Sequence, residues 1–333
     1  MSRVLVTGAN GFIGSNLCRW LLERGWQVDA LVRGSSDLHF LEGLEVRLIR
    51  GDLRRADLID VPAGTTHVIH AAALVSDQAG DDECSRNIYD ATLGLVRRLW
   101  STGAPLRRFV YISTALTLGQ DGRGISEDRP GRSVLYVPYV RHKVRTESVL
   151  RDLRARRGLP TVILRPGDVF GPNDRITCAQ VLQSCERGMP LIAGRGRWHF
   201  GYCHVDNLCR AAELALTVPG IEGRSYTVTN GVLPTWGEFF RALQDGVGVR
   251  QKLYVPVAAA RLLSGVLRAV AAVLPRAKVS LNPYRIRRAT TETTYDISRT
   301  IAELGYVPDD DLERQFAGIL AWYRKEKACG WLA

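Results

Sequence analysis

The stretch VLVTGANGFIGSNLCRWLLERGWQVDALVRG, residues 4–34, decides the fold, because it places a glycine cluster between an apolar run and an amphipathic run. Gly8, Gly11 and Gly14 recur at three-residue intervals. The run before them predicts a strand, and the run after them predicts a helix near 12–24. Glycines at such a junction let the backbone turn tightly and leave the helix N-terminus accessible to an anion such as a pyrophosphate. The spacing is GxxGxxG, which differs from the commonest GxGxxG fingerprint.

Beyond this stretch, apolar runs of strand length alternate with amphipathic helical segments. Strands that are continuously apolar are typical of a parallel sheet covered by helices on both faces. We therefore predict an α/β fold, a doubly wound parallel sheet of the Rossmann type with a smaller C-terminal substrate lobe. The expected strands are 3–8, 26–33, 45–52, 67–73, 107–114 and 160–167, and the expected helices lie near 12–24, 84–102 and 138–157.

After Pro166 the pattern changes to short elements: a loop at 194–207, a helix near 206–217 and a strand at 225–230. No linker rich in Gly, Ser or Pro separates this part from the first. We predict a dinucleotide-binding domain over 1–170 to which 205–232 return, and a substrate-binding lobe built from 171–204 and 233–333.

The composition of the 333 residues, with 46% hydrophobic and 24% charged residues, is typical of a globular protein and argues against extended disorder. The seven cysteines form no CxxC pair and no Cys/His cluster with metal-ligand spacing. We expect reduced thiols, no metal and a cytoplasmic location, since no secretory pattern precedes the first strand. The formal net charge of +11 comes largely from arginines scattered over helix and loop positions, so no nucleic-acid partner is expected.

Tyr139 and Lys143 stand four residues apart in a predicted helix and therefore share one face. A free phenol has a pKa of about 10, which a neighbouring ammonium lowers, so that Tyr139 could exchange a proton with a carbonyl or carbinol oxygen. Thr114 ends a predicted strand and could hold that oxygen. If the register is shifted by one residue, Ser113 takes this place.

Several motifs occur in the order and at roughly the intervals found in one enzyme family: TGANGFIG (7–14), GDL (51–53), HAAA (70–73), VYISTALTLG (110–119), Tyr139 with Lys143, and LRPGDVFGP (164–172). The sequence resembles the extended short-chain dehydrogenase/reductases of the NAD-dependent epimerase/dehydratase superfamily. Within them it looks most like 3β-hydroxysteroid dehydrogenase-like and 3-oxoalkanoate reductase-like members. The resemblance continues through HVDN (204–207) to 295–325.

The resemblance implies that Thr114, Tyr139 and Lys143 are catalytic and that a nicotinamide dinucleotide binds beside them. For Asp52, expected to hold the adenine, the alternative is a helix N-cap. The cofactor-binding residues implied are Gly8, Asn10, Gly11, Phe12, Ile13, Gly14, Arg33, Asp52, Leu53, Ala71, Ala72, Ala73, Tyr139, Lys143, Pro166, Gly167 and Val169.

The end of the second predicted strand favours NADP, with NAD left open. Family members that use NAD commonly have an acidic residue there for the ribose hydroxyls, whereas an arginine accommodates the 2′-phosphate. Here Val32 ends the strand, Arg33 follows, and Asp29 lies too early. The alternative is that Arg33 is an ordinary solvated loop residue.

Two positions depart from the family pattern. The asparagine expected four residues before Thr92 stands five before it, as Asn87. Either Asn87 serves a water relay through a local helix irregularity, or the relay is absent. Nucleotide-sugar epimerases and dehydratases typically carry an arginine, which grips the substrate diphosphate, where this chain has Phe200. Arg197 could take over that role.

The leading interpretation is an NADP-dependent oxidoreductase that interconverts a ketone and a secondary alcohol on a sizeable, partly apolar molecule. The alternatives are a sugar-nucleotide 4-epimerase or dehydratase with tightly held NAD(P), and a non-catalytic NADP-sensing protein.

From Arg250 to Arg288 the chain has nine basic residues and no acidic residue. The apolar part of this segment (255–275) contains Arg261 and Arg268, which argues against a membrane span. Residues 250–288 leave three alternatives: peripheral membrane contact, packing on the sheet, or a groove for an acidic substrate. A homodimer is also left open.

Overall fold

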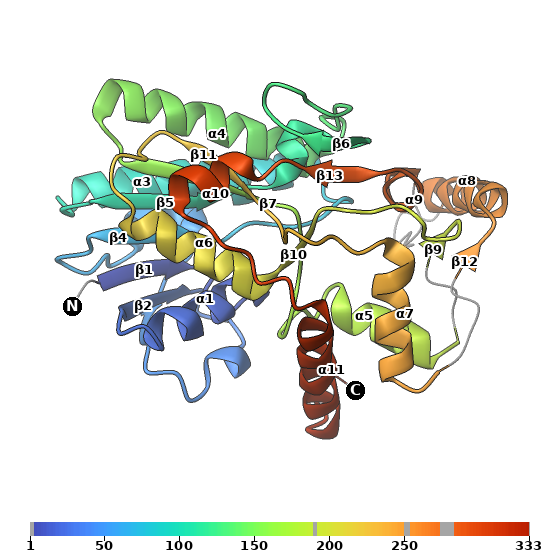
Figure 1. Ribbon diagram of the computed structural model, residues 1–333. Coiled ribbons are helices and arrows are strands. Elements are labelled where there is room, and N and C mark those ends of the chain that lie inside the picture. Colours follow the sequence, from blue (N-terminus) through green and yellow to red (C-terminus); the bar gives the residue numbers. More distant parts are fainter. Residues whose placement is uncertain (1–2, 189–191, 250–253, 274–282, 333) are drawn as a thin grey trace.

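A seven-stranded parallel sheet forms the centre of the computed structural model (Figure 1), which describes residues 3–188, 192–249, 254–273 and 283–332. The strand order is β11-β7-β5-β4-β1-β2-β3. This architecture confirms the predicted doubly wound α/β fold. The strands are β1 (Arg3–Thr7), β2 (Gln27–Val32), β3 (Arg47–Arg50), β4 (His67–His70), β5 (Arg108–Ile112), β7 (Thr161–Pro166) and β11 (Ser225–Val228).

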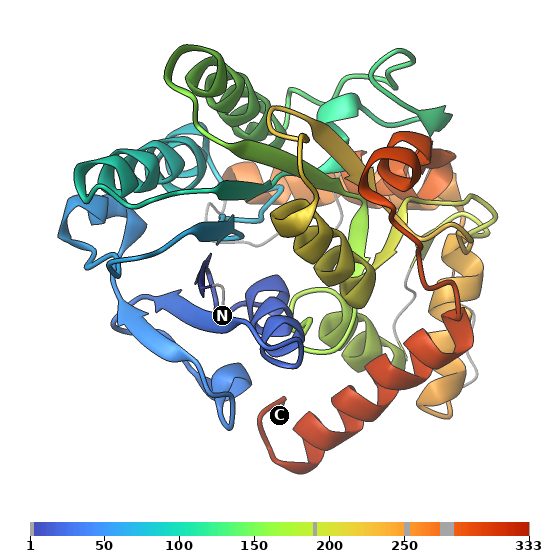
Figure 2. The same ribbon diagram turned by 60° about the vertical axis from the view of Figure 1, so that its left-hand side comes forward.

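The two faces of the sheet are buried under different helices (Figure 2). Successive side chains of a strand point to opposite faces. Val4 and Val6 therefore pack in one core, with α1 (Phe12–Leu22) and α6 (Val205–Thr217), while Leu5 packs in the other. That second core is covered by α3 (Ala91–Ser101) and α4 (Pro138–Arg157). Because both faces of the sheet are covered, the three central residues of β1, Val4, Leu5 and Val6, are all apolar and show no alternation.

The strand order reverses between β1 and β4. From β1 the chain builds β2 and β3 on one side of it, and then β4, β5, β7 and β11 on the other. In the register of this pair Thr7 lies beside His70. In open α/β sheets, ligands bind at such a switch point, outside the carboxyl ends of the strands.

The C-terminal lobe packs around aromatic side chains. Its helices α5 (Cys178–Glu186), α7 (Trp236–Gly246) and α11 (Leu312–Ala328) surround a core that contains Phe170, Phe200, Tyr202 and Phe239. The predicted loop 194–207 contains a short strand, β10 (Tyr202–His204), because the chain pairs there with β8 (Asp168–Phe170). The other short pairs are β12 (Tyr254–Val255) with β9 (Ile192–Ala193), and β13 (Thr293–Tyr295) with β6 (Gly122–Ile125).

Three features of the helices refine the sequence-based expectations. The predicted helix 84–102 is divided into α2 (Asp81–Cys84), a π-helical turn (Ser85–Asp90) and α3. Helix α10 (Ser298–Leu304) lies in the range predicted for the lobe, yet Leu304 packs into the core of the main sheet. Helix α8 (Val257–Val273) precedes α9 (Pro283–Thr290), and no helix among the described residues is long and apolar enough to cross a bilayer.

Short 3₁₀ helices complete the fold. They follow β2, β3 and β5, at the edge where the strands end. Their bounds are His39–Leu41, Leu53–Leu58 and Ala115–Leu118.

Candidate active site

The turn between β1 and α1 contains the three glycines of the opening stretch. Gly8 has a φ of +66°, and a Cβ on it would lie 2.9 Å from the Cα of Ala72. A Cβ on Gly14 would lie 2.0 Å from the carbonyl oxygen of Gly8, so the helix approaches the turn only because residue 14 has no side chain. Gly11 directly precedes α1, whose first N–H groups have no partner within the helix. These residues fit the pyrophosphate of a dinucleotide.

Arg33 lies exposed directly after β2, as predicted. A second arginine is found beside it: Arg50 ends β3 in register with Val32, and its guanidinium donates to the carbonyl oxygen of Gly34 over 3.0 Å. Sequence reasoning missed Arg50, although neighbouring parallel strands end at the same edge and could have indicated it. Two cations therefore lie side by side at the ends of β2 and β3, where the family pattern predicts the adenosine ribose of the cofactor.

Asp52 caps the 3₁₀ helix that begins at Leu53, accepting a hydrogen bond from the Arg54 N–H at 2.9 Å. Its carboxylate also pairs with the Arg54 side chain at 2.6 Å. The Arg54 hydrogen bond lowers the pKa of Asp52, and the charge of Arg33 contributes to this shift. The N-cap alternative is thus realised, and contact with adenine stays a prediction for Asp52 and Leu53.

The remaining predicted cofactor residues lie at the carboxyl edge of the sheet, around the switch point. Pro166 ends β7 and is buried. A Cβ on Gly167 would lie 2.0 Å from the carbonyl oxygen of Gly201, another approach that only glycine permits. The amide of Asn10 donates to the backbone oxygen of Asp37 over 3.2 Å. Partly buried side chains line the same edge at Phe12, Ile13, Ala71, Ala72, Ala73 and Val169.

Helix α4 presents Tyr139 and Lys143 to the end of β5. The Lys143 ammonium donates to the carbonyl oxygen of Ile112 over 2.6 Å and lies 4.6 Å from the centre of the Tyr111 ring. Burial lowers the pKa of Lys143 to about 7, and the charge of Glu147 opposes this shift. Burial raises the pKa of the Tyr139 phenol, while a hydrogen bond with the Thr114 side chain acts in the opposite direction.

Ser113 faces away from Tyr139. Its hydroxyl donates to the carboxylate of Glu147 over 2.6 Å in the buried interior. Glu147 also accepts hydrogen bonds from Arg165 at 2.6 Å and from Arg151 at 2.8 Å. The sequence left two hydroxyls as candidates. In the structure Thr114 lies beside Tyr139, whereas Ser113 is hydrogen-bonded to Glu147 in the interior. The catalytic role of Thr114 stays a prediction.

A buried histidine joins the elements at the switch point. His70 contacts the Thr7 hydroxyl through Nδ1 at 2.7 Å and the Thr92 hydroxyl through Nε2 at 2.9 Å. Since Thr92 donates its only proton to the carbonyl oxygen of Ile88, Nε2 must be the protonated nitrogen. Thr7 then donates to Nδ1 and accepts from the Ala72 N–H, 3.1 Å away. Burial lowers the pKa of His70 to about 3, with a smaller contribution from Lys143.

Asn87 lies on the π-helical turn, so the helix irregularity foreseen as a condition for its role is present. Its amide nevertheless donates to the carbonyl oxygen of Glu83 over 2.8 Å. A role in a proton relay stays unassigned for Asn87.

Helix α9 packs against the predicted catalytic residue Tyr139. Tyr284 packs with Tyr139 against an apolar wall of Leu116, Val134, Val137 and Val140. Three arginines of α9 form ion pairs with aspartates of three separate segments, which fixes the helix over the site. The pairs are Arg285 with Asp77, Arg287 with Asp121, and Arg288 with Asp168.

The position at which an epimerase-like arginine was considered is part of an aromatic core. Phe200 is 1% exposed and stacks on Trp236 with ring centres 3.8 Å apart. Arg197 is exposed, with its guanidinium 4.8 Å from the centre of the Trp198 ring. Neither residue presents a buried cation to a substrate diphosphate.

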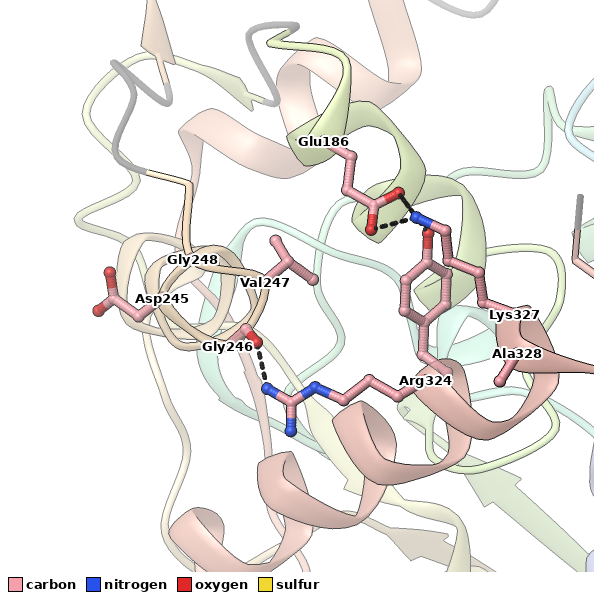
Figure 3. A pocket seen from close by; sticks show the side chains of 9 residues that line it. Glu186, Asp245, Gly246, Val247, Gly248, Arg324, Lys327 and Ala328 are labelled. Carbon is pink, nitrogen blue, oxygen red and sulfur yellow. Dashed lines mark hydrogen bonds and ion pairs between the residues drawn. The ribbon is translucent and has the colours of Figure 1, made fainter.

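A hollow elsewhere in the lobe is separate from this site. Figure 3 shows its lining residues on α5, α7 and α11, where the ammonium of Lys327 pairs with Glu186 at 2.8 Å. Arg324 is bound to the carbonyl oxygen of Gly246. The described lining residues include none of the predicted site residues, so we assign this hollow no part in the chemistry.

Comparison with known proteins agrees with this geometry. The profile described as the NAD dependent epimerase/dehydratase family matches residues 4–228. The chain belongs to this family. It is therefore an NAD(P)-dependent enzyme of the extended short-chain dehydrogenase/reductase type, as the motifs predicted.

Its relatives include proteins named for sterol and prenyl substrates. Sterol demethylase protein B of Methylococcus capsulatus is 31% identical, over 96% of this chain and 98% of the relative. A 4-hydroxy-2-methyl-3-oxo-4-farnesyl-3,4-dihydroquinoline-1-oxide ketoreductase of Stigmatella aurantiaca is 28% identical over 91% of both chains. A 3 beta-hydroxysteroid dehydrogenase/Delta 5-->4-isomerase of Mycobacterium tuberculosis is 26% identical over 97% of this chain and 90% of its own length.

The same fold is found in a UDP-glucuronic acid 4-epimerase from Bacillus cereus, solved with UDP-glucuronic acid and NAD. The TM-score is 0.74 at 22% identity, over 97% of this chain and 99% of that chain. At this identity the likeness extends to the fold alone.

The neutral state of His70 predicts a pH-dependent stability. Its folded pKa of about 3 lies below the unfolded value of ~6.5, so the unfolded chain binds the proton first and stability falls as the pH drops below ~6.5. Between pH 7 and pH 5 this histidine should cost about 2 kcal/mol of unfolding free energy. In urea unfolding without cofactor, His70→Gln should show a correspondingly smaller loss of unfolding free energy between pH 7 and pH 5. Thr92→Val, which keeps the imidazole ring, should show the full loss. Equal drops in the wild type and His70→Gln would contradict the assignment.

Proposed function

We propose that this protein is an NADP(H)-dependent oxidoreductase that interconverts a ketone and a secondary alcohol on a sizeable, partly apolar substrate. One observation carries the proposal: the Tyr139 phenol interacts with the Thr114 side chain beside an apolar wall, while a buried Phe200 occupies the position expected for a diphosphate-binding arginine. Such a site can hold a carbonyl oxygen, and it offers little to a nucleotide sugar.

The proton is handled by Tyr139. In reduction, the substrate oxygen accepts hydrogen bonds from the two hydroxyls, and the phenol of Tyr139 transfers its proton as the carbonyl becomes an alkoxide. A nicotinamide held at the carboxyl edge of the sheet would supply or accept the hydride. In oxidation the same phenol oxygen takes the proton back.

Lys143 stabilises the phenolate that Tyr139 becomes. Its ammonium lies 5.9 Å from the centre of the Tyr139 ring and is fixed by the Ile112 carbonyl. Burial raises the pKa of Tyr139 and lowers the pKa of Lys143 to about 7, so a phenolate at this site needs a cation close by. Protonated Lys143 is placed to offset the negative charge of that phenolate.

An apolar substrate is supported by the arginines around the site, which already have partners within the protein. Arg285, Arg287 and Arg288 are neutralised by aspartates of the same chain, and Arg197 stacks on Trp198 at the surface. A diphosphate binds best to uncommitted cations. The names of the sterol, farnesyl and steroid relatives point the same way.

The preference for NADP is supported by Arg33 and Arg50 at the ends of β2 and β3. A 2′-phosphate carries negative charge that an arginine binds with charge-assisted hydrogen bonds. The residue that directly follows Val32 is Arg33. A family member that uses NAD would be expected to have an acidic residue there to bind the ribose hydroxyls.

The proposal is tested by cofactor turnover on panels of steroid ketones, long-chain oxoacyl compounds and UDP-sugars. A stoichiometric loss of NADPH absorbance with ketones supports it. Conversion of a UDP-sugar without net change in the cofactor spectrum would establish the epimerase alternative, and binding of NADPH without turnover of any compound would favour a sensor.

Tyr139→Phe should lower kcat by a factor of about 10² or more, because the proton donor is lost while the ring still packs with Tyr284. Steady-state rates on the best ketone measure this, and NADPH binding should change little. Tyr89→Phe, on the π-helical turn, provides a control with unchanged rates. A Phe variant with near-normal turnover would overturn the assignment.

Arg33→Ala should weaken NADPH binding by about 1–3 kcal/mol, the usual loss for a charge-assisted hydrogen bond, and should hardly affect NADH. Arg107→Ala is a matched control, since Arg107 is exposed at the opposite, amino end of the sheet, directly before β5. Calorimetric titration with each cofactor measures both. Equal losses for NADPH and NADH, or a wild type that prefers NADH, would argue for an ordinary loop residue.

A further inference from the structure

Helix α8 packs with its small side chains and exposes its large ones. Ala260 and Ser264 are each 2% exposed, and Ala260 lies in a small cluster with Ala193 and Ile286. Leu262, Leu263 and Val266, by contrast, are 73%, 50% and 53% exposed. The three lie one, three and four residues apart, so they form one continuous face of the helix, which we call the α8 apolar face.

We propose that the α8 apolar face docks this protein onto an anionic lipid bilayer. Single exposed apolar residues are ordinary, but contiguous large ones on one helix mark an interaction surface. In an interfacial helix such a face is buried at the boundary of headgroups and acyl chains, with basic residues alongside. Arg261 has this position: it is exposed next to Leu262 on the same helix.

Charge selects the bilayer over a second copy of the chain. The segment 250–288 has no acidic residue, six of its nine basic residues precede α9, and the whole chain carries a formal charge of +11. Two copies meeting through this face would bring like charges together, whereas an anionic membrane attracts them. Arg285, Arg287 and Arg288 take no part, because their partners are Asp77, Asp121 and Asp168.

The position of α8 suits this role. Figure 1 shows the helix at one end of the molecule, away from the main sheet and beside α9, β9 and β12. Its described contacts are mainly with α9, the helix that brings Tyr284 to Tyr139. Docking through α8 would therefore hold the covered side of the active site close to the lipid, where a lipophilic ketone is concentrated.

The test is co-sedimentation of the full chain, without cofactor or substrate, with vesicles of phosphatidylglycerol and phosphatidylcholine at low ionic strength. The wild type should bind, and added salt or vesicles of phosphatidylcholine alone should reduce binding. Leu262→Asn combined with Leu263→Asn should lower the partition coefficient at least about tenfold, because two leucines that the bilayer would bury are lost. Arg261→Gln should lower it about fivefold, the effect of one cation near an anionic surface.

Matched control variants distinguish binding through the α8 apolar face from nonspecific binding to the vesicles. Ile301→Asn combined with Val307→Asn changes residues that are 47% and 70% exposed elsewhere, and Arg97→Gln removes an exposed cation from α3; neither should alter binding. A wild type that ignores anionic vesicles at low salt, or equal losses in the two double variants, would overturn the proposal. So would concentration-dependent dimerisation in sedimentation that the α8 double variant abolishes. Because no turnover is measured, failure here leaves the proposed reaction untouched.

Discussion

The close approach of α1 to the turn that follows β1 is the constraint on which the site depends. A side chain at residue 14 would collide with the Gly8 carbonyl, and one at residue 8 would collide with the backbone of Ala72. Because the turn is this tight, the N-terminus of α1 lies at the carboxyl edge of the sheet, where β1 separates from β4. The anion site, the wall after β4 and the ends of β5 and β7 are brought together by that geometry.

Behind the predicted catalytic groups, α4 carries an ordered series of polar side chains. Tyr139, Lys143, Glu147 and Arg151 recur every four residues on one face of the helix. Lys143 and Glu147 are buried, and Arg151 is exposed. The buried ammonium of Lys143 has the Ile112 carbonyl as its acceptor and the Glu147 charge one turn away. His70, held neutral by its two threonines, adds no second positive charge beside the lysine. Burial of charge at this site is thus compensated locally.

The sequence predicted what depends on local chain properties. Strand positions, the glycine turn, and the shared face of Tyr139 and Lys143 all follow from periodicity or backbone conformation. What it missed depends on contacts between distant segments. Arg50 comes beside Arg33 only through strand pairing, and the aspartates that neutralise α9 lie 120 to 208 residues away in the chain. An acid-free segment therefore looked more cationic in sequence than the folded lobe makes it.

The same long-range pairing bears on which substrates the lobe can accept. A site that binds a diphosphate needs cations whose charge is not already used, and in this chain the three arginines of α9, the helix that packs against Tyr139, are neutralised by the protein itself. Phe200, which stacks on Trp236, also brings no charge that would need a counter-ion. Both features lower the polarity of the lobe and leave the carboxyl edge of the sheet as the fold requires. The residues predicted to handle the hydride and the proton lie at the edge of the sheet, so a change of substrate class in the lobe need not alter them.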